Sequence, residues 1–216
     1  MPNLEQIEVL LSTSYFPPVS YIALLIKARA AFLEIEETFP KQTYRNRCEI
    51  ATVSGKQSLI IPVTKPQGTH TLTRNMGISY RQNWQRHHHR SIETAYGSSP
   101  FFIYYWDDFL PFFENHYEKL IDINREILEV LMKVLGITTE VRFTVKYEKY
   151  PAEKKDYRTF IHPKKLRSSL DFPRYPQVFE QNQGFFADLS ILDLLFNLGP
   201  DSMEYLRRIG SMEPGA

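Results

Sequence analysis

We expect an α/β fold of a single domain, residues 1–216, with a central, mostly parallel sheet. The sheet starts from an N-terminal βαβ unit and is followed by a β-hairpin and a helical C-terminal half. Three observations predict this fold. Strand-like, helix-like and strand-like runs succeed one another within residues 7–35, two β-prone runs flank a Gly-containing turn within 48–63, and an amphipathic run covers 125–135. A chain of 216 residues is long enough to bury one substantial core.

The N-terminal unit is predicted as a strand at Ile7–Ser12, a helix at Pro18–Ala31 and a second strand at Phe32–Ile35. Pro18 suits the first turn of a helix, where a backbone N–H is not needed. Two strands joined by a short helical crossover form a right-handed parallel pair. We therefore expect the two strands to lie side by side and to end at the same edge of the sheet.

The hairpin is predicted from arms at Cys48–Val53 and Ser58–Val63, joined by residues 54–57, which include a glycine. Pro62 cannot donate to a strand ladder, so it ends the second arm or marks it as an edge. Another short strand is expected at Thr73–Ser79.

The following segment is predicted to be mostly helical, with helices at Gln85–Tyr96, Phe101–Phe113 and Arg125–Leu135. The last of these has the clearest pattern, because its apolar residues recur at helical spacing. Asn124 is a suitable N-cap and Gly136 a suitable C-terminal stop. A strand is expected at Val141–Val145, since β-branched and aromatic residues recur there.

Residues 147–176 are expected to be a long irregular segment, because Lys, Arg, Tyr and Pro crowd together there and hydrophobic periodicity is lost. Loops of this length in compact domains are usually functional or disordered. We favour an active-site lid over a protein–protein interaction surface using Lys146–Arg174. After it, Ser190 and Asp193 match a capping box that opens a helix at Ile191–Leu198.

The net charge, the length of the apolar runs and the cysteine count limit the classes of function that the protein can have. The net charge of +1 gives no argument for nucleic acid or an anionic membrane as a partner. The longest apolar runs, Tyr21–Ile26 and Ile191–Phe196, are far shorter than the roughly 20 residues of a membrane span. A single cysteine, Cys48, rules out an internal disulfide and, without a signal-peptide pattern, favours a cytoplasmic location.

Several common motifs are absent from the sequence, including G-x-G-x-x-G, the P-loop, G-x-S-x-G and paired C-x-x-C. The cofactor is therefore unknown at this point. The three consecutive histidines at 87–89 point about 100° apart on a helix, so they cannot jointly bind one metal ion. We predict no metal site.

Candidate site residues follow the two N-terminal strands. Open α/β sheets bind ligands at the carboxyl ends of their strands. Tyr15, Phe16 and Tyr21 come after the first strand, and Glu34 and Glu37 end the second. A carboxylate in this place can serve as a general base, a cation ligand or a hydroxyl acceptor. The alternative is a solvated acidic loop.

The next segment, residues 41–47, offers cations and amides together. Arg47, with Lys41, could grip a phosphate or carboxylate, while Gln42 and Asn46 could bond a sugar hydroxyl or an amide. The alternative is that these cations pair with the nearby glutamates.

Trp84 and His87 are three residues apart and are expected to share one face of a helix. Histidine titrates near neutral pH, so His87 is a candidate acid or base. The alternative is a partly buried structural histidine.

Six short patterns, in order from residue 12 to 200, resemble those of one family. They are Ser14-Tyr15-Phe16-Pro17-Pro18-Val19-Ser20-Tyr21-Ile22, the acidic run Glu34 to Glu37 with Lys41 and Asn46-Arg47, Leu59-Ile60-Ile61-Pro62-Val63, Trp84-Gln85-Arg86-His87, the aromatic element Tyr96 to Phe102, and Leu189 to Gly199. The chain resembles the WbqC-like family, which is named for genes in O-antigen clusters. The family's usual Gln-Pro is Thr13-Ser14 here, and its Gly before Tyr21 is Ser20.

The resemblance implies a cytoplasmic transferase of surface-polysaccharide synthesis that moves an aminoacyl, such as glycyl, or acyl group onto a sugar or nucleotide-sugar. Its partners would be that sugar ligand and an activated donor, and a homodimer is compatible with it. The alternative is a non-catalytic ligand-binding or scaffolding protein of the same pathway, which the changes at Thr13, Ser14 and Ser20 favour. The residues predicted to act catalytically are Glu34, His87 and Arg47, and those predicted to contact substrate are Tyr15, Phe16, Tyr21, Glu37, Lys41, Gln42, Asn46, Trp84 and Tyr96.

Overall fold

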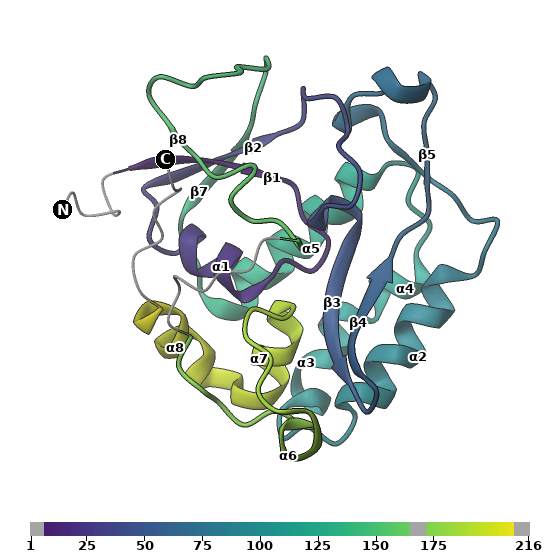
Figure 1. The fold of residues 1–216 in the computed structure, drawn as a ribbon, viewed down its shortest axis with the longest axis vertical. Coiled ribbons are helices and arrows are strands. Elements are labelled where there is room, and N and C mark those ends of the chain that lie inside the picture. Colours follow the sequence, from purple (N-terminus) through teal and green to yellow (C-terminus); the bar gives the residue numbers. More distant parts are fainter. Residues whose placement is uncertain (1–6, 165–171, 210–216) are drawn as a thin grey trace.

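The computed structural model describes residues 7–164 and 172–209. Its main sheet has four parallel strands in the order β7-β2-β1-β8 (Figure 1). Their bounds are Glu8–Ser12 for β1, Ala30–Glu34 for β2, Glu140–Phe143 for β7 and Lys155–Asp156 for β8. Helix α1, Val19–Leu25, connects β1 to β2. The predicted α/β class, the N-terminal βαβ unit and the parallel sheet are confirmed.

The remaining elements are the predicted hairpin, the predicted helices in the latter half and a second short antiparallel pair, β5-β6, which was not predicted. In Figure 1 the β3-β4 hairpin stands beside α2, while α7 and α8 lie below the main sheet. The bounds are β3 Arg47–Thr52, β4 Gly55–Ile60, β5 Val63–Thr64, β6 Gly77–Ile78, α2 Trp84–Tyr96, α3 Phe102–Phe109, α4 Pro111–Glu114, α5 Leu120–Leu135, α6 Glu180–Gln183, α7 Ile191–Leu198 and α8 Ser202–Arg208, with single 3-10 turns at Tyr44–Asn46, Gly68–His70, Thr73–Asn75 and Gly199–Asp201.

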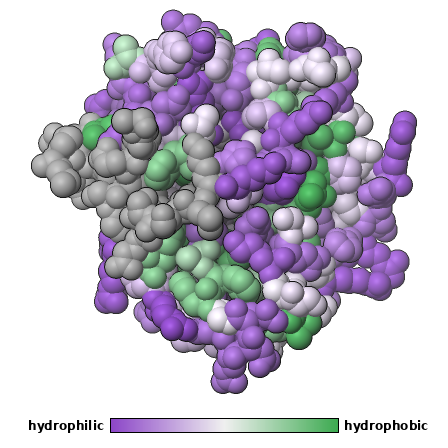
Figure 2. All heavy atoms as spheres, in the orientation of Figure 1, coloured by the Kyte–Doolittle hydropathy of each residue, from purple (hydrophilic) through white to green (hydrophobic). Residues whose placement is uncertain are grey.

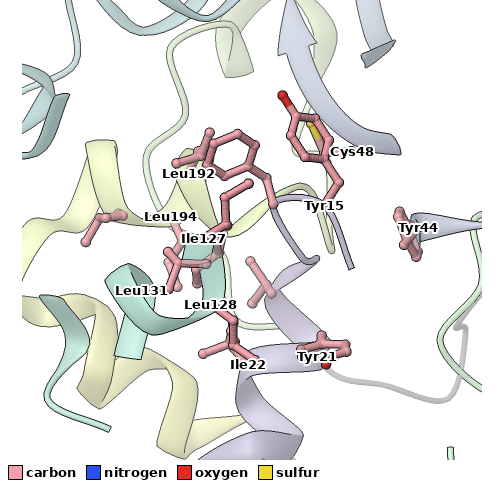
Figure 3. Close-up of a cluster of buried hydrophobic side chains, with 14 of the residues drawn as sticks. Tyr15, Tyr21, Ile22, Tyr44, Cys48, Ile127, Leu128, Leu131, Leu192 and Leu194 are labelled. Atoms are coloured by element: carbon pink, nitrogen blue, oxygen red, sulfur yellow. The ribbon is translucent and has the colours of Figure 1, made fainter. Parts of the chain in front are cut away.

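The main core lies on one face of the sheet. Figure 3 shows Ile22 of α1, Ile127 and Leu131 of α5, and Leu192 and Leu194 of α7 gathered in one buried cluster. All five side chains are fully buried. By contrast, the outer surface seen in Figure 2 is largely hydrophilic, with apolar side chains in separate patches.

Two predicted boundaries are wrong because tertiary pairing overrides local propensity. The first helix ends at Leu25 rather than Ala31, since Ala30 and Ala31 pair with β1 as strand residues. In the hairpin, Thr52 pairs with Gly55, so Val53 and Ser54 form the turn in place of residues 54–57. Gly55 has φ of +104°, a conformation that favours glycine.

Three more predictions need correction in the connecting segments and helices. Within Thr73–Ser79 the described strand is just Gly77–Ile78, and Pro111 divides the predicted helix Phe101–Phe113 into α3 and α4. Residues 147–176 contain β8, which pairs with β1. Residues 165–171 of that segment lie outside the described residues.

Two predicted caps act differently in the fold. Helix α5 begins at Leu120, and Asn124 lies inside it with its amide donating to the Arg45 carbonyl at 2.8 Å. Ser190 does cap α7, but the Asp193 carboxylate turns inward to accept from Tyr175 instead of reaching back. In both cases a tertiary partner takes the polar side chain that local capping would have used.

Candidate functional site

The carboxyl ends of the four parallel strands carry a polar row on the face opposite the main core. Ser12 is paired with Glu34 in the sheet register. Thr144 directly follows the end of β7, and Arg158 lies two residues after the end of β8. Glu34 accepts hydrogen bonds from the Thr144 hydroxyl at 2.9 Å and from the backbone N–H of Glu36 at 2.8 Å. Its other oxygen accepts from Arg158 at 3.1 Å.

Arg158 ties this row together. Its guanidinium donates to Glu34, to Asp156 at 2.6 Å and to the backbone carbonyl of Glu148 at 2.9 Å. The Glu34 side chain is fully buried and that of Arg158 is nearly so. Because Glu34 already accepts three hydrogen bonds, it is suited to hold Arg158 and Thr144 in position rather than to take a proton from a substrate.

A second buried ion pair lies beside the first. Arg45 donates to the Glu37 carboxylate at 2.7 Å and to the Ser12 hydroxyl. Burial raises the pKa of Glu37, and the Arg45 charge opposes that shift. The Tyr21 hydroxyl donates to the Ser12 carbonyl at 2.9 Å, and burial raises its pKa above the usual range. Glu37 and Tyr21 therefore belong to the same buried polar network as Ser12.

The strand order changes direction between β1 and β8, which is the place where open α/β sheets commonly bind ligands. Here that crevice is lined by residues that include Ser12, Thr13, Tyr44 and Tyr157, and its volume is about 10 Å³. Such a volume suits about one water molecule. The crevice is closed to any larger ligand in this conformation.

The histidine that shares a buried face with Trp84 is His88 rather than His87. Its Nδ1 atom lies 2.9 Å from the Tyr15 hydroxyl, and its ring lies 5.2 Å from that of Trp84. Burial lowers the pKa of His88 to about 3, and the neighbouring His87 adds to the shift. His88 is thus neutral near pH 7 and serves as a hydrogen-bonded core residue.

An open cavity of about 710 Å³ lies between α2 and the tip of the β3-β4 hairpin, and we name it the helix–hairpin cavity. Arg86, His87 and Arg90 project into it from α2, while hydroxyls come from both elements. Val53 and Phe179 supply apolar surface, and no carboxylate is among its described lining residues. The cavity is therefore cationic and has the size of a typical ligand pocket.

A smaller cavity of about 300 Å³ lies over the outer face of the main sheet, and we name it the sheet cavity. Leu10 and Phe32 are paired in the sheet and form part of its lining, together with Glu34. The loop from Thr144 to Lys154 supplies the other side.

The predicted site residues are thus distributed rather than gathered in one cavity. Glu34 lines the sheet cavity, Tyr21 the closed crevice and His87 the helix–hairpin cavity. Tyr15, Phe16, Trp84 and Tyr96 are buried in the aromatic core, and Figure 3 shows Tyr15 beside Cys48. Their contact with a ligand stays a prediction.

The remaining predicted residues lie in the segment that leads into β3. Lys41 and Gln42 are exposed, and Asn46 donates to the Ile61 carbonyl at 2.9 Å. Arg47 begins β3, and its Nε atom is buried with no hydrogen-bond partner among the described residues, as is Nε1 of Trp84. Their roles toward a ligand also stay predictions.

Three arginines that shape these sites, Arg86, Arg90 and Arg158, are not among the residues predicted from the sequence. Arg45, one of the cations of residues 41–47, pairs with Glu37, as the alternative for that segment expected. Arg86 and Arg90 could have been found, because two cations four residues apart share one face of a predicted helix. Arg158 gave no usable signal, since it follows a strand of two residues with no apolar pattern.

Two features are absent from the described residues, a metal-binding group of side chains and a membrane-spanning helix. No group of three or more His, Cys, Asp and Glu side chains within residues 7–164 and 172–209 is arranged to hold a metal ion. Nor does any helix in that part of the chain have the length and apolar character to cross a bilayer.

The fold and these cavities define an α/β protein with a four-stranded parallel sheet and an open cationic cavity. The sequence pattern of the WbqC-like protein family matches residues 13–167, so the chain belongs to that family. The chain is also 25% identical over 223 residues to the uncharacterised protein Rv1507c of Mycobacterium tuberculosis, an alignment that covers 92% of this chain and 96% of the relative. The comparison with solved structures gave no match.

Proposed function

We propose that this WbqC-like protein is a cytoplasmic transferase of surface-polysaccharide synthesis, and that it binds a nucleotide-sugar in the helix–hairpin cavity. The transferred group would be an aminoacyl or acyl group from an activated donor. Family membership supports the pathway, and the charge and size of the cavity support the ligand class.

The observation that carries the proposal is the pair of arginines on α2. Arg86 and Arg90 lie one helical turn apart, about 6 Å along the axis, and both are exposed. Among the described residues neither has a carboxylate within ion-pair distance. Two unneutralised guanidinium groups at this spacing suit a diphosphate, which arginine binds through several charge-assisted hydrogen bonds.

His87 lies between the two arginines in sequence and lines the same cavity. It would accept the proton of the attacking hydroxyl or amine as the new bond to the donor carbonyl forms and the leaving group departs with its electron pair. The flanking hydroxyls of Ser91 and Thr94 would bond the sugar. In this arrangement Arg86 and Arg90 take the anion-binding role that the sequence suggested for Arg47 and Lys41.

A second candidate function is non-catalytic ligand binding in the same pathway. The surroundings of Glu34 favour it, because three hydrogen-bond donors already bind the carboxylate of that predicted base. The two candidates differ in whether His87 has a chemical task.

The test is transfer measured by mass spectrometry with a panel of nucleotide-sugars and aminoacyl or acyl donors. The transferase proposal predicts a product with the wild type, a loss of at least a hundredfold in kcat for His87→Gln, and near-normal turnover for His89→Gln, a neighbour on the same helix. Tight nucleotide-sugar binding without any product from the whole panel would favour the non-catalytic function instead.

A further inference from the structure

We propose that the sheet cavity is a second binding site, specific for a small anionic sugar, in which Lys154 holds the anion and Phe32 supports the sugar ring. The two cavities share no lining residue, so this inference does not depend on the proposed transferase function.

The floor of the cavity comes from the sheet register. Leu10, Phe32 and Arg142 are neighbours across β1, β2 and β7, so their side chains lie in one row on the face opposite the main core. Leu10 is buried, but Phe32 stays partly exposed in the middle of a strand. The exposed part of the Phe32 ring that the Lys154 ammonium does not cover offers apolar surface on which the C–H groups of a sugar ring can pack.

The charge in the cavity comes from three cations, of which two are already paired. Arg142 bonds Glu140, and Lys146 lies 3.0 Å from Glu148. The Lys154 ammonium lies 4.5 Å from the centroid of the Phe32 ring and, among the described residues, has no carboxylate within ion-pair distance. The ring face holds this ammonium in place by a cation–π interaction. The Glu148 carboxylate of the same cavity has its pKa lowered first by Lys146 and to a smaller extent by Lys154, but Lys154 forms no ion pair with it and can still bind an anion.

The remaining walls suit one sugar ring. Val145 and Pro151 of the loop between β7 and β8 add apolar surface, and Glu148 adds an acceptor for sugar hydroxyls. A volume of about 300 Å³ is at the lower end for ligand pockets, which fits a single ring better than a nucleotide. The location at the carboxyl ends of parallel strands is also the one that α/β sheets use for ligands.

The anion of the ligand is a carboxylate or a phosphate, both of which Lys154 could bind as a point charge. The probes are therefore D-glucuronate and glucose 1-phosphate, with methyl glucoside as the neutral control. Binding is measured by titration calorimetry on the full chain carrying Arg86→Gln and Arg90→Gln, which removes the arginines of the other cavity.

We expect at least one of the two anionic probes to bind at least tenfold more tightly than methyl glucoside, and the one that binds identifies the anion. Lys154→Gln should weaken that binding at least tenfold, and Phe32→Leu should weaken it without removing the charge preference. Lys149→Gln is the matched control, because Lys149 is an exposed lysine of the same loop that lies over Tyr150.

Three results would overturn the proposal: no binding of either anionic probe, equal losses in the Lys149 and Lys154 variants, or binding to the wild type that vanishes with the two arginine changes. An unchanged melting temperature of Lys154→Gln would show that its loss of binding is not a loss of folding. If that variant is unstable, the Phe32 variant decides alone.

Discussion

Asp193 is a buried carboxylate, and its surroundings favour the protonated form over the charged form. One oxygen accepts from the Tyr175 hydroxyl at 2.6 Å and from the Gln177 amide at 2.8 Å. The other oxygen has no hydrogen-bond partner in the described structure. Tyr96 also lies close to the Asp193 side chain. Burial raises the pKa of Asp193 to about 6, and the hydrogen bonds only partly oppose the shift.

This raised pKa predicts a pH-dependent contribution to stability. An unfolded Asp has a pKa of about 3.9, so the fold favours the protonated form. The stabilisation is complete below pH about 4 and is lost as the pH rises through about 6. Asp193→Asn cannot titrate there. The unfolding free energy of the wild type minus that of Asp193→Asn should fall by up to about 3 kcal/mol between pH 4 and 7.5.

Urea unfolding of both proteins across that pH range measures the difference. Because His88 is the same in both, its own titration cancels. Two curves that run parallel from pH 4 to 7.5 would contradict the raised pKa.

At the level of single residues, the sequence predicted some roles through spacing and missed others. The buried face of α2 contains Trp84, His88 and Ile92, each four residues from the next, so helical periodicity alone would have chosen His88 as the core histidine. Glu34 was predicted as a base from its place at a strand end. The Glu34 carboxylate accepts hydrogen bonds from Thr144 and Arg158, which lie more than 100 positions away in the sequence. No local sequence pattern reveals such partners.

The end of α7 depends on a close approach between the Gly199 backbone and the Phe101 ring. Gly199 ends α7 with φ of +53°, and a Cβ atom built there would lie 2.4 Å from the Phe101 ring. Gly136 ends α5 with a similar φ of +66°, but a Cβ atom there would meet nothing within 4 Å. The two glycines differ both in conformation and in packing: Gly136 is in the left-handed helical region with ψ of +34°, whereas Gly199 has ψ of −122°, a combination that essentially only glycine adopts.

This difference predicts unequal costs for two alanine substitutions. Gly136→Ala should cost about 1 kcal/mol of unfolding free energy, since alanine disfavours the left-handed conformation. Gly199→Ala should cost about 1–3 kcal/mol more, because its backbone conformation disfavours alanine further and Phe101 must also move. Thermal and urea unfolding measure both. Equal losses in the two variants would contradict the account that conformation and the Phe101 contact together make the end of α7 the more demanding position.

The elements that the sequence predicted well are those with long periodic patterns or clear stop signals. Helix α5 ends at Gly136 as expected, and the βαβ unit forms where its apolar runs placed it. Strand β8 could not be predicted, because Lys155–Asp156 owes its strand form to pairing with β1. Two residues are too short to show a period of two.

At the level of the whole molecule, the two cavities lie in different parts of the fold and share no lining residue. The loop from 144 to 154 arches over the end of the main sheet in Figure 1, while the β3-β4 hairpin and α2 enclose the other cavity. Glu34 and His87 are both among the residues that the sequence predicts to act catalytically. The structure gives each of them its own cavity, and this separation depends on how the hairpin docks on α2.

Part of the predicted lid segment, residues 147–176, lies beside the closed crevice. Tyr157 and Ile161, from the described part of residues 147–176, line the closed crevice at the end of β1. A lid role for the segment stays a proposal, as do the single domain and the homodimer.

Arg86 and Arg90 are proposed to make the helix–hairpin cavity a diphosphate site. Titration calorimetry of uridine diphosphate against the wild type, Arg86→Gln, Arg90→Gln and Arg81→Gln tests it most directly. Arg81 is the matched control, because it is an exposed arginine just before α2 that does not line the cavity. We predict binding to the wild type, a loss of at least tenfold in each of the first two variants, and an unchanged Kd for Arg81→Gln. Absence of binding, or an equal loss in all three variants, would contradict the claim.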